Sequence, residues 1–130
     1  MTDRRGFTMV EVMISLTLLT IVMLGLGKFM VSFLRNSGRA NALNVAAAVA
    51  QERVNLIEAD PRYTAVNSLY GTGATADTTG FPGFPRMRRR TTIARDQTGS
   101  PARDFTTITV RVTDPSMKDT VSLTSVRAKP

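Results

Sequence analysis

An uncharged run of sixteen residues, from Val12 to Gly27, constrains this chain more than any other feature of its sequence. As a helix the run would span about 24 Å at ~1.5 Å per residue, which is somewhat less than the apolar core of a bilayer. Extending the helix back to Phe7 completes a full span and places one carboxylate, Glu11, inside it. The sequence therefore predicts a membrane-spanning half of a helix over residues 7–28.

Glu11 is the unusual residue of this span. An ionised side chain in a membrane helix costs about 2 kcal/mol or more, so such residues usually face a partner and mark a function. In the uncut chain the nearest cations are Arg4 and Arg5. If the chain were cut between Gly6 and Phe7, the new amine would lie four residues from Glu11, which makes them helical neighbours of opposite charge. The carboxylate would also stabilise the first turn through the helix dipole.

The N-terminal segment resembles the type III signal of type IV pilins and of the pseudopilins of type II secretion systems. The resemblance lies in the basic residues, Gly6, Phe7, Glu11 and the apolar run, in that order. The resemblance covers about a quarter of the chain. It implies that residues 1–6 are a leader peptide, that prepilin peptidase, a membrane aspartyl enzyme, cuts after Gly6, and that the Phe7 amine is methylated. It also implies that Phe7 and Glu11 act in assembly with other pilin or pseudopilin subunits.

Two other interpretations of the N-terminal segment are an ordinary signal anchor with an incidental glutamate and a secretory signal peptide. The signal peptide fits worse, because its cleavage site should follow the apolar region with small residues, whereas Lys28, Phe29 and Met30 stand there. The resemblance implies a single-pass protein of the bacterial inner membrane with its C-terminal region on the periplasmic side, and incorporation into a cell-surface filament is compatible with this. The opposite orientation is favoured by charge count, because basic residues tend to stay on the cytoplasmic side and three of them follow the span: Lys28, Arg35 and Arg39. We follow the resemblance.

The composition argues against an enzyme. At 130 residues, the chain has room for one small domain besides the helix. It contains no histidine and no cysteine, which removes the commonest general base, thiolate metal ligands and every disulfide. We expect no catalytic residue, no metal and no cofactor. Another interaction must hold the C-terminal end, which many pilins close with a disulfide.

A helical pattern continues beyond Gly27 and predicts an amphipathic half over residues 29–60. One helix from Phe7 to Glu58 would be about 78 Å long at ~1.5 Å per residue. Asp60-Pro61 should end it, because the residue before proline avoids the helical region. Apolar residues at alternating intervals of four and three predict its buried stripe, with Arg53 mostly off it. The predicted stripe is Phe29, Phe33, Asn36, Ala40, Leu43, Ala47, Ala50, Val54 and Ile57.

The remainder, residues 61–130, predicts a loop and a small C-terminal β-sheet region. Glycines and prolines favour a loop over residues 62–86, in which Phe81 and Phe84 pin the loop to the core or meet a partner. Alternating apolar residues predict strands over 91–95, 107–113 and 119–126, with a hairpin loop at 114–118. Val126 breaks the alternation and predicts a bulge or a strand end. The fold class is α+β: a long N-terminal helix packed on a small antiparallel sheet, as in pilins.

The densest charge run contains four arginines, at positions 86, 88, 89 and 90. As a basic strand start it would guard a sheet edge against pairing. As an anionic-partner patch, Arg86, Arg88, Arg89 and Arg90 could meet a protein, a lipid or, less favourably, DNA, which Phe81 and Phe84 could contact by stacking.

Two functions follow from these features. The first is a structural subunit, a minor pilin or pseudopilin, of a type IV pilus or type II secretion filament. The alternative is a membrane-anchored DNA-binding or adhesion module of an uptake pilus. The expected partners are prepilin peptidase, other subunits and the inner membrane.

Overall fold

A computed structural model describes residues 6–99 and 103–129. The chain forms two compact units that divide between Ser37 and Gly38, and each is described by itself. One helix, α1 (Met9–Ala59), belongs to both units. The predicted leader residues Arg4 and Arg5 lie outside the described residues. α1 ends just before Asp60-Pro61, as the proline predicted, and begins at Met9, two residues later than expected.

The first unit contains the apolar part of α1. From Met9 to Leu34, its large apolar side chains are exposed along every face of the helix. Two threonine hydroxyls donate hydrogen bonds to the carbonyls four residues before them: Thr17 to Met13 (2.9 Å) and Thr20 to Leu16 (2.8 Å). These bonds satisfy the two hydroxyls within the helix itself, which suits a segment surrounded by lipid.

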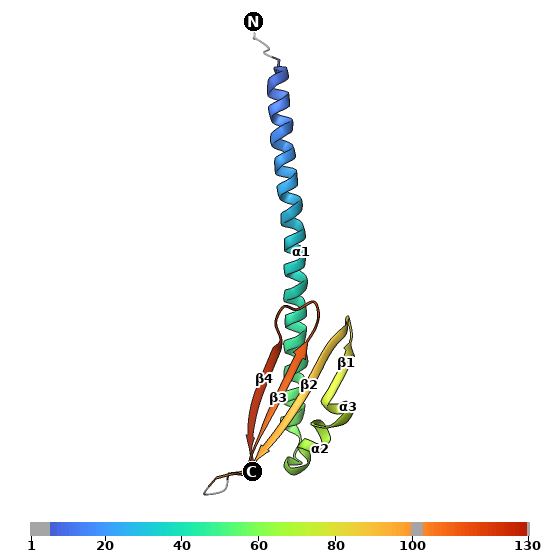
Figure 1. Cartoon of the computed structure of the whole chain (residues 1–130), viewed down its shortest axis with the longest axis vertical. Coiled ribbons are helices and arrows are strands. Elements are labelled where there is room, and N and C mark those ends of the chain that lie inside the picture. Colours follow the sequence, from blue (N-terminus) through green and yellow to red (C-terminus); the bar gives the residue numbers. More distant parts are fainter. Residues whose placement is uncertain (1–5, 100–102, 130) are drawn as a thin grey trace. The chain divides into compact units, whose positions relative to one another are not determined.

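The second unit contains a four-stranded sheet in the order β1-β2-β3-β4 (Figure 1). All neighbouring strands are antiparallel, with register pairs such as Asp77 with Arg90, Arg90 with Arg111, and Val110 with Leu123. The strands are β1 (Asp77–Phe81), β2 (Phe84–Asp96), β3 (Phe105–Thr113) and β4 (Val121–Ala128). The loop between β3 and β4 lies where the hairpin loop was predicted.

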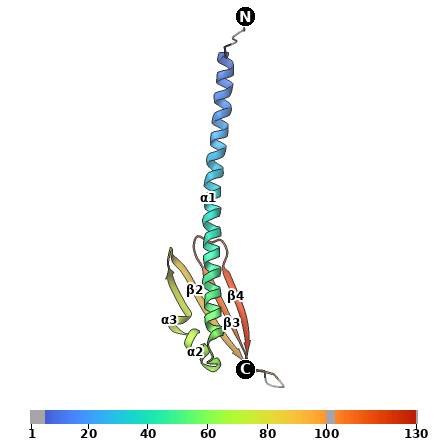
Figure 2. The ribbon, with the colours of Figure 1, turned by 180° about the vertical axis from the view of Figure 1, so that it is seen from behind.

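One face of this sheet packs on the C-terminal part of α1, as Figures 1 and 2 show from opposite sides. Side chains alternate across a strand, so every second residue of β3 points to the helix. Ile108, Val110 and Val112 are fully buried there. The helix contributes Ala42, Ala46, Val49, Ala50, Val54 and Ile57 to the same core, and Met87, Ile93 and Met117 complete the sheet side. The predicted α+β, pilin-like architecture is thereby confirmed.

The predicted helix stripe was wrong over its first turns in this unit. Ala40 and Ala47 are exposed, Leu43 is half-buried, and the core instead follows Ala42, Ala46 and Val49. Alanine occupies positions 46, 47, 48 and 50, so the apolar pattern fits several phases of the helix equally well. The prediction was correct at Ala50, Val54 and Ile57.

The prediction of a loop over residues 62–86 was also wrong. The segment contains η1 (Tyr63–Ala65), α2 (Val66–Tyr70) and α3 (Gly73–Ala76), followed by β1. Pro82 and Gly83 close a tight hairpin between β1 and β2, and Gly83 has φ +76°, which glycine adopts without strain. Phe81 and Phe84 flank this turn and are half-buried against the core, so the pinning interpretation is confirmed.

The predicted bulge at Val126 is absent, and β4 ends two residues beyond it, at Ala128. Val126 pairs with Thr107 and is 62% exposed, because it lies on the face of the sheet away from α1. The break in the apolar alternation at Val126 therefore does not correspond to a bulge in β4.

Arg127 secures the C-terminal strand in the absence of a disulfide. Its guanidinium donates hydrogen bonds to the carbonyls of Asp60 (2.7 Å) and Ile57 (3.5 Å), at the end of α1. It also lies 5.7 Å from the centre of the Tyr63 ring, while the Arg95 guanidinium lies 5.3 Å from that centre. These contacts join β4 to the helix end by hydrogen bonds and cation–π attraction.

Candidate functional site

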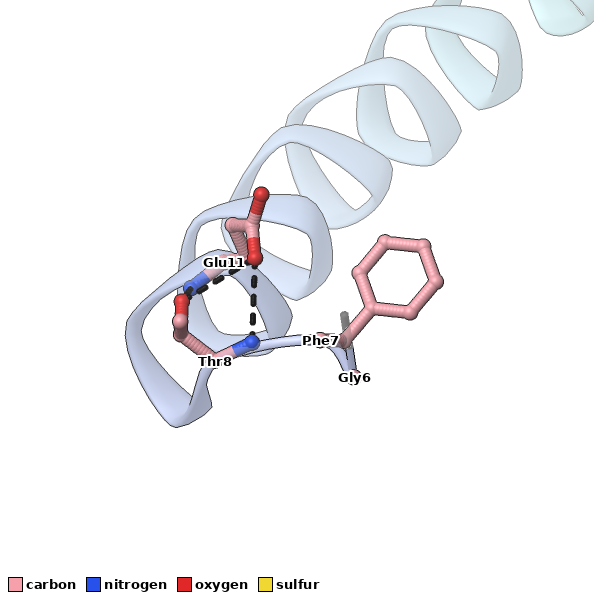
Figure 3. A pocket seen from close by; sticks show the side chains of 4 residues that line it. All are labelled: Gly6, Phe7, Thr8 and Glu11. Carbon is pink, nitrogen blue, oxygen red and sulfur yellow. Dashed lines mark hydrogen bonds between the residues drawn. The ribbon is translucent and has the colours of Figure 1, made fainter. Parts of the chain in front are cut away.

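The Gly6–Phe7 bond lies in a short non-helical segment ahead of α1. Gly6, Phe7 and Thr8 are exposed, and with Glu11 they line a shallow depression (Figure 3). A methyl group added at Gly6 would meet no described atom within 4 Å. The bond is thus accessible to a peptidase, and nothing in the described packing requires glycine at this position.

Thr8 and Glu11 form a capping box at the start of α1. The Thr8 N–H donates to Glu11 Oε2 at 3.0 Å, and the Glu11 N–H donates to Thr8 Oγ1 at 3.3 Å. The Thr8 hydroxyl donates to the same Oε2 at 3.0 Å. Reciprocal bonds of this kind satisfy backbone donors that the first turn leaves without partners. Figure 3 shows the two residues joined by these bonds.

This arrangement fixes the direction of the carboxylate. Oε2 of Glu11 accepts both Thr8 donors, whereas no described donor contacts Oε1. The side chain is exposed, so a cation from outside the described chain can approach Oε1. Thr8 and Glu11 both follow Gly6, so a cut after Gly6 would retain the capping box.

The apolar part of α1 fits a transmembrane segment. In the part of the chain that the structure describes, α1 is the one helix long and apolar enough to cross a membrane, judged by length and composition. The most apolar stretch buries no residue within the described structure, unlike the core helix of a soluble domain. Such a helix removed from lipid would expose a large apolar surface to water.

The fold is pilin-like in architecture, and its long apolar helix fits a transmembrane segment. Residues 1–27 match the family model of the prokaryotic N-terminal methylation motif, which is a type IV prepilin-like signal. Proteins with this motif are structural subunits rather than enzymes, and the motif implies processing by prepilin peptidase and assembly with other pilins. No curated protein and no solved structure matches the chain.

The four arginines of the charge run do not form one patch. They lie on β2, where side chains alternate between the two faces of the sheet. Arg86, Arg88 and Arg90 point away from α1, whereas Arg89 points toward it and is half-buried. The edge-guard interpretation is wrong, because β2 is paired with β1 on one side and β3 on the other. The run thus belongs to an inner strand.

Arg89 lies near enough to a second arginine, Arg53, on the helix side of the sheet, for their charges to repel. Arg53 is buried and donates to Thr91 Oγ1 (3.4 Å) and to the carbonyl of Thr75, with its guanidinium 5.1 Å from the centre of the Tyr70 ring. Burial, and then the nearby Arg89 charge, lowers the pKa of Arg53. The side chain therefore ties α1 to β2 and to the segment ahead of β1.

Sequence reasoning missed three residues of these sites. Thr8 was overlooked although Thr8-x-x-Glu11 has capping-box spacing, a signal that could have identified it. Arg53 was placed off the buried stripe, and its burial depends on hydrogen-bond partners far along the chain. Arg111 was not associated with the arginine run, since only the pairing of β2 with β3 brings it opposite Arg90.

Proposed function

We propose that this chain is a minor pilin or pseudopilin, a structural subunit of a type IV pilus or type II secretion filament. Prepilin peptidase cuts after Gly6 and methylates the Phe7 amine, and α1 then anchors the subunit in the inner membrane with residues 60–130 on the periplasmic side. Assembly proceeds through Phe7 and Glu11. The small size of the region after α1 favours a minor subunit over the bulk one.

The observation that carries the proposal is the direction of the Glu11 carboxylate at the exposed start of an apolar helix. Thr8 holds one carboxylate oxygen and leaves the other without a described donor. A carboxylate in lipid is costly without a cation, and Thr8 supplies hydrogen bonds but no charge. After cleavage the chain's own Phe7 amine is a nearby cation, but Phe7 lies outside α1, so the helix does not hold that amine against Glu11. A neighbouring subunit can supply that charge through its own Phe7 amine.

This pairing would also set the stagger of subunits along the filament. A charge pair in a low-dielectric environment is favourable only when its geometry is close, so helices displaced by other amounts would leave both charges unpaired. Apolar contacts alone specify no such position, because exposed apolar side chains surround α1 on every face from Met9 to Leu34. The Glu11–amine contact therefore supplies register, and the apolar surface supplies contact area.

Replacing Glu11 tests the assembly mechanism. Glu11→Gln keeps the shape and can still accept the Thr8 hydrogen bonds, but it cannot neutralise an incoming amine. We expect normal insertion and cleavage with reduced incorporation, measured as the ratio of tagged variant to wild type in sheared filaments or crosslinked assembly complexes. Glu52→Gln is the matched control, because Glu52 is an exposed acid on the same helix, far from its start. Equal ratios for Glu11→Gln and wild type at equal membrane levels would refute the mechanism.

Replacing Gly6 tests the processing step. The described structure has room for a side chain at this position, so Gly6→Val should leave the chain inserted in the membrane. We expect it to remain uncut, because a branched side chain keeps the peptidase from the backbone. Intact mass of membrane-extracted protein distinguishes the two forms: the wild type should begin at a methylated Phe7. A mature wild-type protein that retained residues 1–6 would contradict the proposal.

A further inference from the structure

The sheet face that points away from α1 carries a cluster of arginines and threonines. Two adjacent depressions on this face share Arg90 and Arg111. Arg88 and Thr113 complete the first, whose volume is about 140 Å³, and Thr92 and Thr109 complete the second, whose volume is about 290 Å³. We call these six residues the outer basic face.

Its central feature is a pair of like charges. Arg90 and Arg111 are directly opposed across β2 and β3, a position in which like charges destabilise an antiparallel pair. Opposed residues of neighbouring strands have Cα atoms about 4.5–5.5 Å apart, so both guanidiniums can reach one group above the sheet. The pair is thus placed where it repels unless an anion lies between its members.

The described acids nearby do not neutralise this pair. Asp77 is the residue opposite Arg90 on β1, but its two carboxylate oxygens accept hydrogen bonds from Arg88. The carboxylate of Asp77 also lies close enough to Arg90 for attraction to contribute to its lowered pKa. One carboxylate is thus shared between Arg88 and Arg90, while Arg111 has Arg90 opposite it on β2 and Ser122 opposite it on β4. Arg86, further along β2, faces Asp114 instead.

The chemistry of the lining suits a phosphate. Guanidinium groups form paired hydrogen bonds with phosphate oxygens, and the hydroxyls of Thr92 and Thr109 add donors on the same face. A phosphodiester exposes two non-bridging oxygens that share one negative charge, so one phosphate can accept from Arg90 and Arg111 together. A second copy of this chain is an unfavourable partner, because every copy is strongly basic: the formal charge is +7, and loss of Asp3, Arg4 and Arg5 with residues 1–6 leaves +6.

We propose that the outer basic face binds the phosphates of a phosphodiester polymer, with Arg90 and Arg111 holding one phosphate between them. The two adjacent depressions favour a polymer over a free phosphate, because consecutive phosphates of one chain can occupy both. Arg86 and Arg88 contribute less, since Asp114 and Asp77 already lie beside them. The six residues include no aromatic ring, so the face contacts the backbone without reading bases. The DNA-binding alternative thus applies to this set of residues and not to the four-arginine run.

The test measures binding of a fluorescent DNA duplex to the full chain in detergent micelles. Fluorescence anisotropy at salt concentrations of ~50 to 200 mM gives the affinity and its salt dependence. The site variant is Arg90→Gln with Arg111→Gln. The control is Arg103→Gln with Lys118→Gln, which removes the same charge from two exposed loop residues. Both variants should fold, because all four side chains are exposed, and their thermal midpoints verify this.

We expect the site variant to lose at least about tenfold in affinity and to lower the slope of log K against log salt by about two, while the control changes little. Equal losses in the two variants would show that net charge alone attracts DNA, and would overturn the proposal. Equally tight binding of polyglutamate would overturn the choice of phosphate. Displacement of the duplex by inorganic phosphate at matched ionic strength would overturn the choice of a polymer.

This inference is separable from the proposed filament function. The site variant leaves Gly6, Phe7 and Glu11 unchanged, so we expect normal cleavage and incorporation whatever its DNA affinity. A failure of DNA binding therefore does not bear on assembly, and a failure of the Glu11 test does not bear on the outer basic face.

Discussion

The packing of α1 on the sheet predicts a large difference between two adjacent residues, Ile57 and Leu56. Ile57 is 0% exposed and belongs to the core between helix and sheet, whereas Leu56 is 46% exposed. Both can be shortened to alanine without loss of helix propensity, since alanine is the best helix former. The pair is therefore a matched test of which helix face is buried.

The expected magnitude follows from the atoms removed. Ile57→Ala deletes three buried carbon atoms, which at about 0.8 kcal/mol each accounts for about 2.4 kcal/mol. The cavity left between helix and sheet adds to this, and such substitutions cost about 2–5 kcal/mol in total. For a domain of this size, a loss of ~3 kcal/mol lowers the unfolding midpoint by roughly 12–24 °C. Leu56→Ala should change stability by less than about 1 kcal/mol, because much of its side chain stays in water in both states.

Thermal unfolding of the full chain in detergent micelles measures this difference. Near-ultraviolet circular dichroism follows Tyr63 and Tyr70, which contact arginine side chains only when the second unit is folded. The micelle stabilises the apolar part of α1 in both variants, so the signal reports the second unit. An Ile57→Ala midpoint no lower than that of Leu56→Ala would refute the packing of this helix face against the sheet.

Two further predictions concern the helix start and the folded C-terminal unit. Thr8→Val removes the cap hydroxyl and should destabilise the first turn of α1 by about 1 kcal/mol, which would make amide exchange at Glu11 in micelles roughly fivefold faster. The control variant Thr8→Ser keeps a hydroxyl and should exchange like wild type. Equal exchange rates in the two variants would contradict the capping box. Hydrogen bonds, of which the one from Arg95 has the largest effect, lower the pKa of Asp104 from 3.8 to about 2. The ionised carboxylate therefore stabilises the folded state above pH ~4, and this contribution is lost as the pH falls toward 2. Asp104→Asn should therefore flatten the acid side of the stability profile, and an unchanged profile would show that Asp104 is not the group responsible.

Features with a local cause were predictable from the sequence. The uncharged run, the Gly6–Phe7 junction and Glu11 lie within one continuous stretch, and membrane energetics acts on that stretch directly. The end of α1 was predictable because Pro61 restricts the backbone of its neighbour. β3 was predictable because its alternation is unbroken from Ile108 to Val112.

Features that depend on pairing across the chain were not predictable. β1 has a glycine at position 80 and threonines instead of alternating apolar residues, so only its pairing with β2 makes it a strand. That same pairing makes β2 an inner strand. Because side chains alternate along a strand, Arg89 then lies on one face of the sheet and Arg88 and Arg90 lie on the other. The sequence shows four neighbouring cations, but their faces follow from the register of β2 with its two neighbours.

Arg127 shows how long-range pairing can take the place of a covalent link at the C-terminal end. The last turn of α1 contains no basic residue, so no cation within that turn stabilises the partial negative charge of its carbonyls. The pairing of β4 with β3 brings the Arg127 guanidinium to the carbonyls of Ile57 and Asp60. A disulfide would stabilise the fold largely by restricting the unfolded chain, whereas these hydrogen bonds exist only when helix and sheet are both in place. The stability of the C-terminal end therefore depends on the same helix–sheet packing that buries Ile57.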